Sequence, residues 1–198
     1  MVKRSGMRNK KYRFSFTAAS LQVPTMIAMA RKMMREDITT EQLSPDDMGK
    51  ERYKTSQREF REIKARLECL SRDEIRLLSE GPFEEQKLIS FVSFARLYRY
   101  FYEFMIEVVA EKILVFDYTL TEMDYNVFFN RKAVDHTEVE RLTTATQNKV
   151  KQVVFKVLEQ AGIINNIQER VIQAPQLSPS FVALLSATNP QDVKLLLN

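Results

Sequence analysis

TTATQNKVKQVVFKVLEQAGIINNIQERVIQA, residues 143–174, is the stretch that decides the predicted fold. Its first part predicts an amphipathic helix, because apolar residues recur at helical spacing at Val150, Val153, Val154, Val157, Leu158 and Ala161. The helix is expected to stop at Gly162, and a polar turn follows between two apolar pairs, Ile163–Ile164 and Val171–Ile172. This order is typical of a winged helix-turn-helix, in which a recognition helix precedes a small β-hairpin.

The polar side of this helix carries residue types that contact DNA. Its amino-terminal part, the end that enters the major groove in recognition helices, holds Thr144, Gln147, Asn148, Lys149 and Lys151. Gln and Asn can read adenine edges, while Lys and Thr contact phosphates or bases. Asn165–Arg170 would form the tip of the wing, with Arg170 beside the DNA backbone. The alternative is an interaction domain, since winged-helix domains also bind proteins.

A second candidate helix lies in the basic half of the chain. Residues 1–72 hold 17 Lys and Arg against 9 Asp and Glu, a balance of +8, whereas residues 73–198 hold 13 against 17, a balance of −4. Residues 50–66 are especially basic, and their polar start lies in front of an apolar face formed by Phe60, Ile63, Leu67 and Leu70. They resemble the second helix of a helix-turn-helix, with residues 38–48 as the preceding helix and turn. Mixed Glu and Arg pairs are equally typical of a solvated, salt-bridged helix.

The polar residues of both helices, the wing and a basic amino-terminal arm together form the predicted DNA-contacting set. Its members are Lys10, Lys11, Arg13, Lys50, Arg52, Lys54, Thr55, Gln57, Arg58, Arg61, Thr144, Gln147, Asn148, Lys149, Lys151 and Arg170.

Composition predicts a mostly helical protein. The chain has 198 residues, of which only 4 are Gly and 6 are Pro, and this disfavours a turn-rich all-β fold. We expect an all-α fold with one short β-hairpin wing, and helix-turn-helix or winged-helix elements at both ends of a central helical core. The expected division is a basic amino-terminal domain, residues 1–81, and a second domain, residues 82–198, with the central helices and the winged unit.

Motifs of enzymes and metal sites are missing from the sequence. There is no phosphate-binding glycine loop, no H-E-x-x-H and no G-x-S-x-G. A single cysteine and a single histidine are too few for a structural zinc site. As a catalytic pair they are poorly placed, because Cys69 falls beside an apolar helix face and His136 at a helix start. We therefore predict no enzyme, no metal or cofactor, and no small-molecule substrate.

The sequence also argues against membrane insertion. The basic amino-terminus is followed by an apolar stretch that polar residues interrupt, unlike a signal peptide. Leu88–Phe116 is rich in apolar residues, but charged residues recur every three or four positions at Arg96, Arg99, Glu103, Glu107 and Glu111. Each charge at mid-bilayer would cost about 2.5–3.5 kcal/mol, so a long, mostly buried core helix with one polar stripe explains the pattern better. We expect a cytoplasmic protein.

Four segments along the chain resemble the BrxA family of BREX bacteriophage-exclusion systems. They are FSFTAASLQVPTMIAMAR at 14–31, REFREIKARLECLSRDEIRLLSEG at 58–81, FMIEVVAEKIL at 104–114 and NKVKQVVFKVLEQAGII at 148–164. The resemblance implies a mostly helical protein, compared within the family with NusB-like antitermination factors. It also implies a role in defence against phage, alongside a methyltransferase, an ATPase and other BREX proteins.

Taken together, the residues and the resemblance predict a non-enzymatic subunit that binds double-stranded DNA, mainly through phosphates. The alternative is a scaffold or adaptor that holds another BREX protein without contacting nucleic acid. RNA binding is a third option that rests on analogy of fold alone, because the Phe and Tyr residues at 91–104 are expected to lie in the core.

Overall fold

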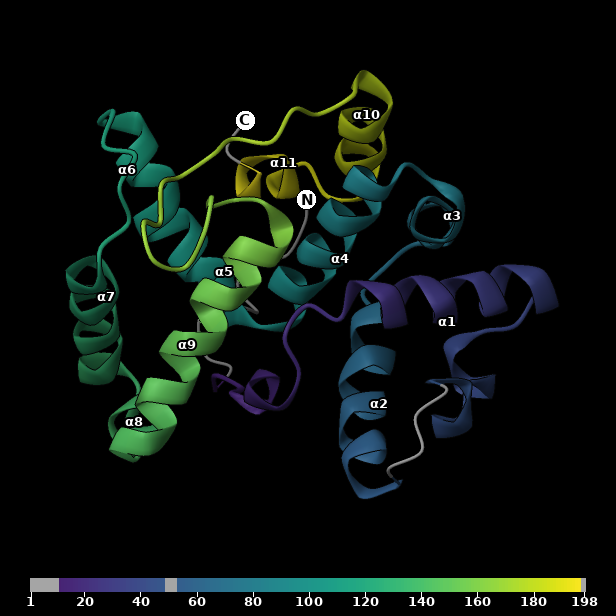
Figure 1. Ribbon diagram of the computed structural model, residues 1–198, viewed down its shortest axis with the longest axis horizontal. Coiled ribbons are helices and arrows are strands. Elements are labelled where there is room, and N and C mark those ends of the chain that lie inside the picture. The colour runs from purple at the N-terminus through teal and green to yellow at the C-terminus, as the bar shows by residue number, and fades with distance from the viewer. Residues whose placement is uncertain (1–10, 49–52, 197–198) are drawn as a thin grey trace, which may run out of the picture.

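Helices form most of the protein in the computed structural model, which describes residues 11–48 and 53–196, without the side chains of residues 53–56 (Figure 1). The α-helices are α1 (Val23–Glu36), α2 (Tyr53–Leu67), α3 (Arg72–Glu80), α4 (Phe83–Leu97), α5 (Arg99–Phe104), α6 (Ala110–Leu114), α7 (Glu122–Asp135), α8 (Thr137–Glu140), α9 (Thr144–Ala161), α10 (Pro179–Thr188) and α11 (Gln191–Leu195). Three short 3₁₀ helices are η1 (Ser15–Ala18), η2 (Thr40–Gln42) and η3 (Pro45–Met48), and η4 (Met105–Val109) is a π-helix between α5 and α6.

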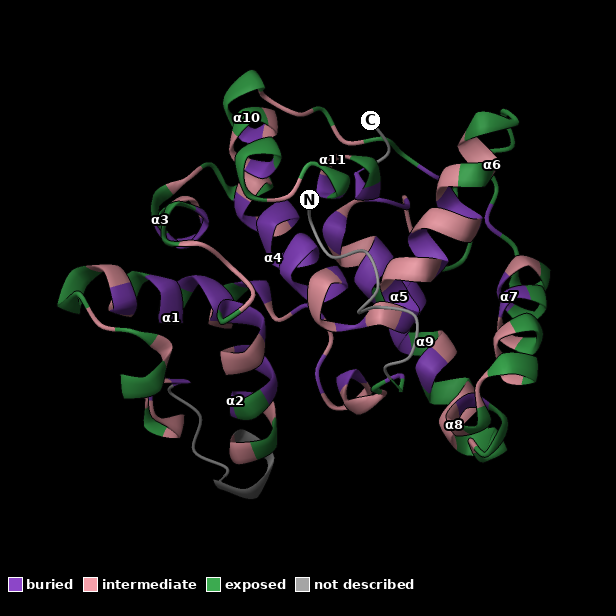
Figure 2. Ribbon diagram, turned by 180° about the vertical axis from the view of Figure 1, so that it is seen from behind, coloured by how far each residue is buried: buried purple, intermediate pink, exposed green. Residues whose placement is uncertain are grey.

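The core is centred on α4 and α5. Helices α1, α2 and α3 lie on one side of this pair, α6, α7 and α8 lie on the other, and α9 crosses the middle (Figure 1). Aromatic rings join the central helices: Phe91 and Phe101 have centroids 5.5 Å apart, and Phe94 and Phe101 have centroids 4.9 Å apart. The buried faces of the surrounding helices turn toward this centre (Figure 2). The aromatic segment is therefore a core element, as the sequence predicts.

The predicted unbroken central helix is wrong at Tyr98. Helix α4 ends at Leu97, and Tyr98 leaves the helical region with φ −111° and ψ 89° before α5 begins. The Tyr98 side chain is fully buried, and its hydroxyl donates a hydrogen bond to the Glu62 carboxylate of α2. Because the helix breaks there, Arg96 bonds to Glu74 while Glu103 bonds to the Tyr12 hydroxyl. The predicted single polar stripe is thus split in two.

Helix ends agree with local sequence signals, among them the Ser71-Arg-Asp-Glu74 pattern of a capping box and the helix start at Ser178-Pro179. The Ser71 and Glu74 side chains form this capping box at the start of α3. Gly162 ends α9 in the left-handed region, at φ +76°, where a side chain would be strained. The Ser178 hydroxyl caps α10 by accepting a hydrogen bond from the Phe181 N–H at 3.1 Å.

The predicted β-hairpin wing is wrong, since no strand forms in residues 11–48 and 53–196. A single bridge joins Ile164 to Ile172, and another joins Val171 to Thr119. Residues 170–173 form backbone hydrogen bonds with two different segments. The Gln173 N–H donates to the Ile163 carbonyl, and the Ile172 N–H donates to the Tyr118 carbonyl. Ile163, Ile164 and Ile172 are buried, so these segments close the core and do not project as a wing.

The structure of the segment predicted to begin the amino-terminal helix-turn-helix also differs from the prediction. Residues 38–48 form the two short turns η2 and η3, not an α-helix. A capping box of Thr39 and Gln42 closes the first turn, and Pro45 begins the second. The helix-turn-helix at this end is therefore incomplete. The predicted boundary between residues 81 and 82 coincides with the short connection from α3 to α4 and stays a prediction.

Candidate nucleic-acid interface

The amino-terminal end of α9 presents polar side chains to solvent. The Thr143 hydroxyl caps the helix by accepting a hydrogen bond from the Thr146 N–H at 3.3 Å. The apolar face is buried through Val150, Val153, Val154, Phe155, Val157, Leu158 and Ala161. The predicted DNA-contacting residues that lie exposed at this end are Thr144, Asn148 and Lys149.

Two predicted contacts on α9 are already engaged within the protein. The Gln147 amide is half-buried and donates a hydrogen bond to the Leu142 carbonyl at 2.9 Å, which fixes the turn before the helix. The Lys149 ammonium donates to the Gln152 side chain at 3.0 Å, and this neutral partner does not compensate its charge. Lys149 thus remains a candidate for contact with a phosphate. Gln147 would have to break its hydrogen bond to the Leu142 carbonyl before it could contact a base.

The remaining two cations of this unit share one carboxylate. The Lys151 ammonium lies 2.8 Å from the Glu122 carboxylate, and an Arg170 guanidinium nitrogen lies 3.4 Å from it. The hydrogen bond from Lys151, with its charge and that of Arg170, lowers the pKa of the Glu122 carboxyl. Arg170 also lies over the Phe155 ring, 4.9 Å from its centroid. The predicted wing arginine is therefore held against the protein.

Helix α2 carries exposed cations without such compensation. Arg58 and Arg61 are exposed, and neither has an ion-pair partner among residues 11–48 and 53–196. Gln57 lies half-buried beside them. They face solvent because the opposite side of α2 packs into the core through Phe60, Ile63, Arg66 and Leu67. Lys54 and Thr55 lie in α2, but their side chains are outside the described residues, as are Lys10, Lys50 and Arg52 altogether.

Arg66 has a different role from the other basic residues of α2. It is fully buried, and its guanidinium donates to three backbone carbonyls, those of Ala19 at 2.7 Å, Ser20 at 2.7 Å and Leu21 at 3.2 Å. The sequence held a signal for this, since Arg66 follows Ile63 by three positions and so falls on the apolar side of the helix. Arg66 fixes the chain before α1 and is unavailable to DNA.

The amino-terminal arm is anchored at one residue. The buried Tyr12 donates its N–H to Glu138 of α8 at 2.8 Å and its hydroxyl to Glu103 of α5 at 2.5 Å. Lys11 and Arg13, its neighbours, lie exposed on the opposite side of this extended segment. The structure thus places these two cations on either side of a residue that is held against α8, the helix immediately before α9.

The two candidate helices, α2 and α9, pack against the same neighbouring elements. Their amino-terminal ends point toward the same edge of the molecule (Figure 1). The short helix η1 packs against both α2 and α9, and α4 also packs against both. The predicted cations come from these two helices and one arm. Those exposed within the described residues are Lys11, Arg13, Arg58, Arg61 and Lys149.

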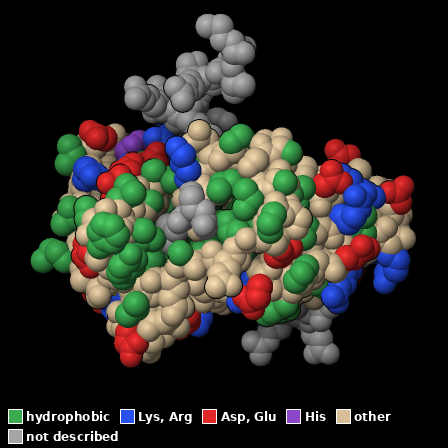
Figure 3. All heavy atoms as spheres, turned by 90° about the horizontal axis from the view of Figure 1, so that it is seen from above, with side chains coloured by type: hydrophobic (Ala, Val, Ile, Leu, Met, Phe, Trp, Pro, Cys, Tyr) green, Lys and Arg blue, Asp and Glu red, His purple; other side chains and the backbone are tan. Residues whose placement is uncertain are grey.

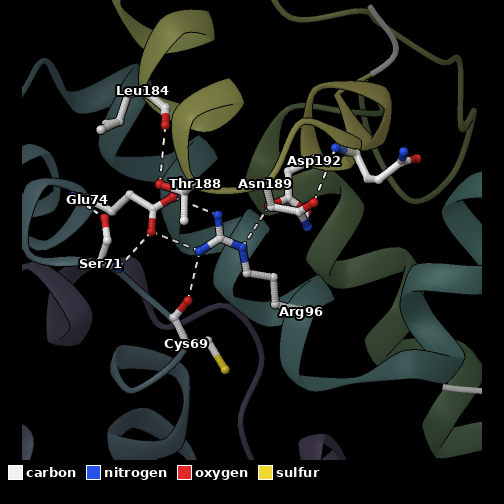
Figure 4. A network of polar contacts seen from close by, with 9 residues as sticks. Cys69, Ser71, Glu74, Arg96, Leu184, Thr188, Asn189 and Asp192 are labelled. Carbon is white, nitrogen blue, oxygen red and sulfur yellow. Dashed lines mark hydrogen bonds and ion pairs between the residues drawn. The ribbon is translucent and has the colours of Figure 1, made fainter. Parts of the chain in front are cut away.

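A second group of charges is buried and structural. The Arg96 guanidinium lies 2.6 Å from Glu74 of α3 and 2.8 Å from Asp192 of α11, and it donates to the Cys69 carbonyl at 2.7 Å (Figure 4). Burial raises the pKa of the Asp192 carboxyl, whereas the hydrogen bonds from Arg96 and Ser71 outweigh burial and hold that of Glu74 low. Glu74 and Asp192 have no exposed side-chain surface, so this cluster ties three helices together.

Neither the cysteine nor the histidine forms part of a reactive cluster. Cys69 is half-buried just beyond the end of α2, and burial raises the pKa of its thiol. His136 packs against the Tyr12 ring, with centroids 4.2 Å apart. Within the described ranges, no three His, Cys, Asp or Glu side chains are arranged to hold a metal ion. No helix in those ranges is both long and apolar enough to cross a bilayer.

The fold and this surface define an all-helical protein with exposed cations on two helices and on the amino-terminal arm. The chain belongs to the BrxA family, whose model matches residues 10–189. The protein is similar to the BREX protein BrxA of Bacillus cereus (strain H3081.97), with 34% identity over 126 residues, 63% of this chain and 63% of the relative. It is also similar to the BREX protein BrxA of Escherichia coli O9:H4 (strain HS), with 26% identity over 139 residues, 70% of this chain and 65% of the relative.

These alignments span just under two thirds of the length of the curated relatives. The fold is also that of a solved structure, the crystal structure of an uncharacterized protein from Magnetospirillum magneticum. The TM-score is 0.78 at 16% sequence identity, and the match covers 96% of this chain and 99% of that one. At this identity the likeness shows the fold alone.

Proposed function

We propose that this chain is a non-enzymatic component of a BREX phage-defence system, in which it binds double-stranded DNA mainly through phosphates. The observation that carries the proposal is the pair of exposed arginines on α2, Arg58 and Arg61, which lack a carboxylate partner in the described part of the chain. Phosphate contacts need exposed, uncompensated cations, since they act by releasing counterions from the duplex. Lys11 and Arg13 of the arm and Lys149 of α9 would add contacts along the same edge.

The structure changes the relative weight of the two predicted helices in this proposal. On α9 and its following turn, Lys151 and Arg170 already share the Glu122 carboxylate. On α2, both exposed arginines are available. We therefore assign most of the attraction to α2 and the arm, and a smaller part to the start of α9.

Removing the two arginines of α2 should weaken DNA binding and flatten its salt dependence. Each phosphate contact contributes about 0.9 to the slope of log affinity against log salt, so Arg58→Ala with Arg61→Ala should reduce the slope by about 1.8. We would measure affinity for a double-stranded oligonucleotide by gel shift at several salt concentrations.

A matched control for this experiment is Arg35→Ala with Arg76→Ala. These exposed arginines lie on α1 and α3, and each lies beside a carboxylate. Because both double variants remove two arginines, they change the net charge of the protein by the same amount. It should bind nearly as well as the parent protein. Equal losses in both double variants would reduce the proposal to a net-charge effect, and no shift by the parent protein at low salt would refute DNA binding. Competition with double-stranded RNA of the same sequence would separate the two nucleic acids.

Lys151→Ala should change DNA affinity by less than about twofold, because the ammonium is already neutralised by Glu122. The same gel-shift titration measures this. Lys149→Ala provides the comparison, since Lys149 lies two positions before Lys151 on the same helix and its partner, Gln152, is neutral. A loss for Lys151→Ala larger than that for Lys149→Ala would mean that the ion pair opens when DNA binds.

A further inference from the structure

An exposed apolar surface covers the end of the molecule farthest from α1 and α2. Seven large apolar residues of α6, α7 and the turn between them are exposed: Leu114, Val115, Phe116, Tyr118, Met123, Val127 and Val134. Hydrophobic side chains gather at this end of the molecule when it is viewed from above (Figure 3). We call this set the α6–α7 surface. Single exposed apolar residues are ordinary, but several at one end of a molecule are typical of a binding site.

Helix α7 is apolar on two opposite faces. Tyr125 and Phe128 are buried against the core. Met123, Val127 and Val134 lie on the other side of the helix, at spacings of four and seven residues, and are 69%, 58% and 85% exposed. The first face explains how α7 folds onto the protein. The second face, formed by Met123, Val127 and Val134, does not pack against the core. It is apolar, whereas the solvent-facing side of a helix is usually polar.

Phe116 has a strained, left-handed backbone conformation at the end of α6. Its N–H donates to the Ile113 carbonyl and the Asp117 N–H donates to the Lys112 carbonyl, so α6 ends in a Schellman motif. The residue at this position has φ +58°, where glycine is usual and phenylalanine is strained. The Phe116 ring is 81% exposed and gains no core packing in return. Strain of this kind is characteristic of binding sites.

A groove runs beside this surface, between η4–α6 and α7. It has a volume of about 380 Å³, and Val108, Val115 and Val127 contribute apolar walls. Four carboxylates and two cations also line it, and a third cation, Lys132, pairs with the lining carboxylate of Glu107 at 2.7 Å, which leaves a net charge of −1. Among those carboxylates, Glu111 is exposed and has no ion-pair partner within the described ranges.

Charge selects the kind of molecule that fits this groove. DNA and anionic lipids would be repelled by the net negative lining. In a symmetric pair of copies the same patch would face itself, so two negative grooves would meet. A protein segment with an apolar side flanked by Lys or Arg satisfies both the apolar walls and the unpaired carboxylate.

We infer that the α6–α7 surface and its groove bind an amphipathic, basic segment of another protein, with Phe116 as an apolar anchor. This site lies away from the edge assigned to DNA and does not depend on DNA binding. The protein would then have two separate surfaces, a cationic one for nucleic acid and an apolar, acidic one for a protein partner.

Phe116→Gly tests the anchor, because it should move stability and binding in opposite directions. Glycine relieves the left-handed strain without loss of core packing, so the melting temperature should rise by about 2–4 °C. A labelled helical peptide of leucine and lysine, of about 14 residues or four turns, serves as the basic amphipathic probe. Its affinity for the full chain, measured by fluorescence anisotropy, should fall about tenfold in Phe116→Gly.

Four comparisons make this test decisive. Glu111→Lys should also weaken the lysine peptide about tenfold, and a peptide with glutamate in place of lysine should bind the parent protein far more weakly. Phe83→Ala is the matched control, because Phe83 is 58% exposed on α4, outside the groove, and its loss should change nothing. DNA binding by Phe116→Gly should stay at the parent level, which separates this site from the proposed DNA contacts.

The inference would be overturned by any of three results. These are a lower melting temperature for Phe116→Gly, equal binding of the two peptides, or unchanged peptide binding in both Phe116→Gly and Glu111→Lys. Sedimentation of the full chain gives a further check. A concentration-dependent dimer that Phe116→Gly abolishes would assign the surface to a second copy and refute the basic partner.

Discussion

Arg66→Ala is expected to lower the free energy of unfolding by about 3–5 kcal/mol, the largest effect of any single substitution considered. The guanidinium satisfies three carbonyls before α1, and it lies over the Phe94 ring, 4.7 Å from the centroid. Alanine would leave these carbonyls without donors and open a cavity between α2 and α4. Urea unfolding followed by circular dichroism measures the change.

Arg61→Ala is the matched control for Arg66→Ala. Arg61 lies on the same helix and is exposed, so its removal should alter stability by less than about 0.5 kcal/mol. Arg66→Lys should recover only part of the loss, because an ammonium lacks the planar fork that reaches three carbonyls. Similar stabilities for the two alanine variants would show that Arg66 does not hold the chain before α1.

Glu74→Gln is expected to destabilise the protein by about 2–3 kcal/mol, whereas Asp192→Asn should cost less than about 1 kcal/mol. Both carboxylates contact Arg96, and both side chains are fully buried. Their pKa values move in opposite directions, because Glu74 accepts hydrogen bonds from Arg96 and from the Ser71 N–H, while burial dominates at Asp192. The cluster therefore needs the Glu74 charge more than that of Asp192. Urea unfolding at pH 7 measures the difference.

The pH dependence of the two variants should also be opposite. A carboxyl whose folded pKa is lowered stabilises the fold above its unfolded pKa, and this contribution is lost as pH falls through the folded value. That is the case for Glu74, so acid should reduce the gap between the parent protein and Glu74→Gln. A raised pKa has the reverse sign, so the small cost of Asp192→Asn at neutral pH should grow as pH falls toward the carboxyl range. Equal losses in both variants at pH 7 would contradict this division of roles.

Local sequence signals predicted the helix ends well. Ser71 with Glu74, Gly162 and Ser178 act within one turn of the chain, so their effect is visible in a short window. The buried faces of α2 and α9 were also predictable, because helical periodicity specifies which side packs. For the same reason, Arg58 and Arg61 were correctly expected on the solvent side.

Contacts between distant segments were not predictable in this way. Tyr98 breaks the central helix while its buried hydroxyl bonds to Glu62, 36 residues away. The wing was expected from two apolar pairs, but three of their four residues, Ile163, Ile164 and Ile172, pack into the core. The Ile172 N–H also donates to the Tyr118 carbonyl, on the other side of this segment. Periodicity reports which residues are apolar, and it does not report which distant segment they meet.

The same limit applies to the stretch at 143–174. The sequence by itself determined that this stretch contains an amphipathic helix with a polar, basic start, because side-chain spacing and capping are local properties. Only the tertiary structure decided that Lys151 and Arg170 share Glu122, and that Arg58 and Arg61 have no such partner in the described chain. The availability of a charge depends on which opposite charge the fold brings within a few ångströms, and that distance is set by the packing of helices far apart in the chain.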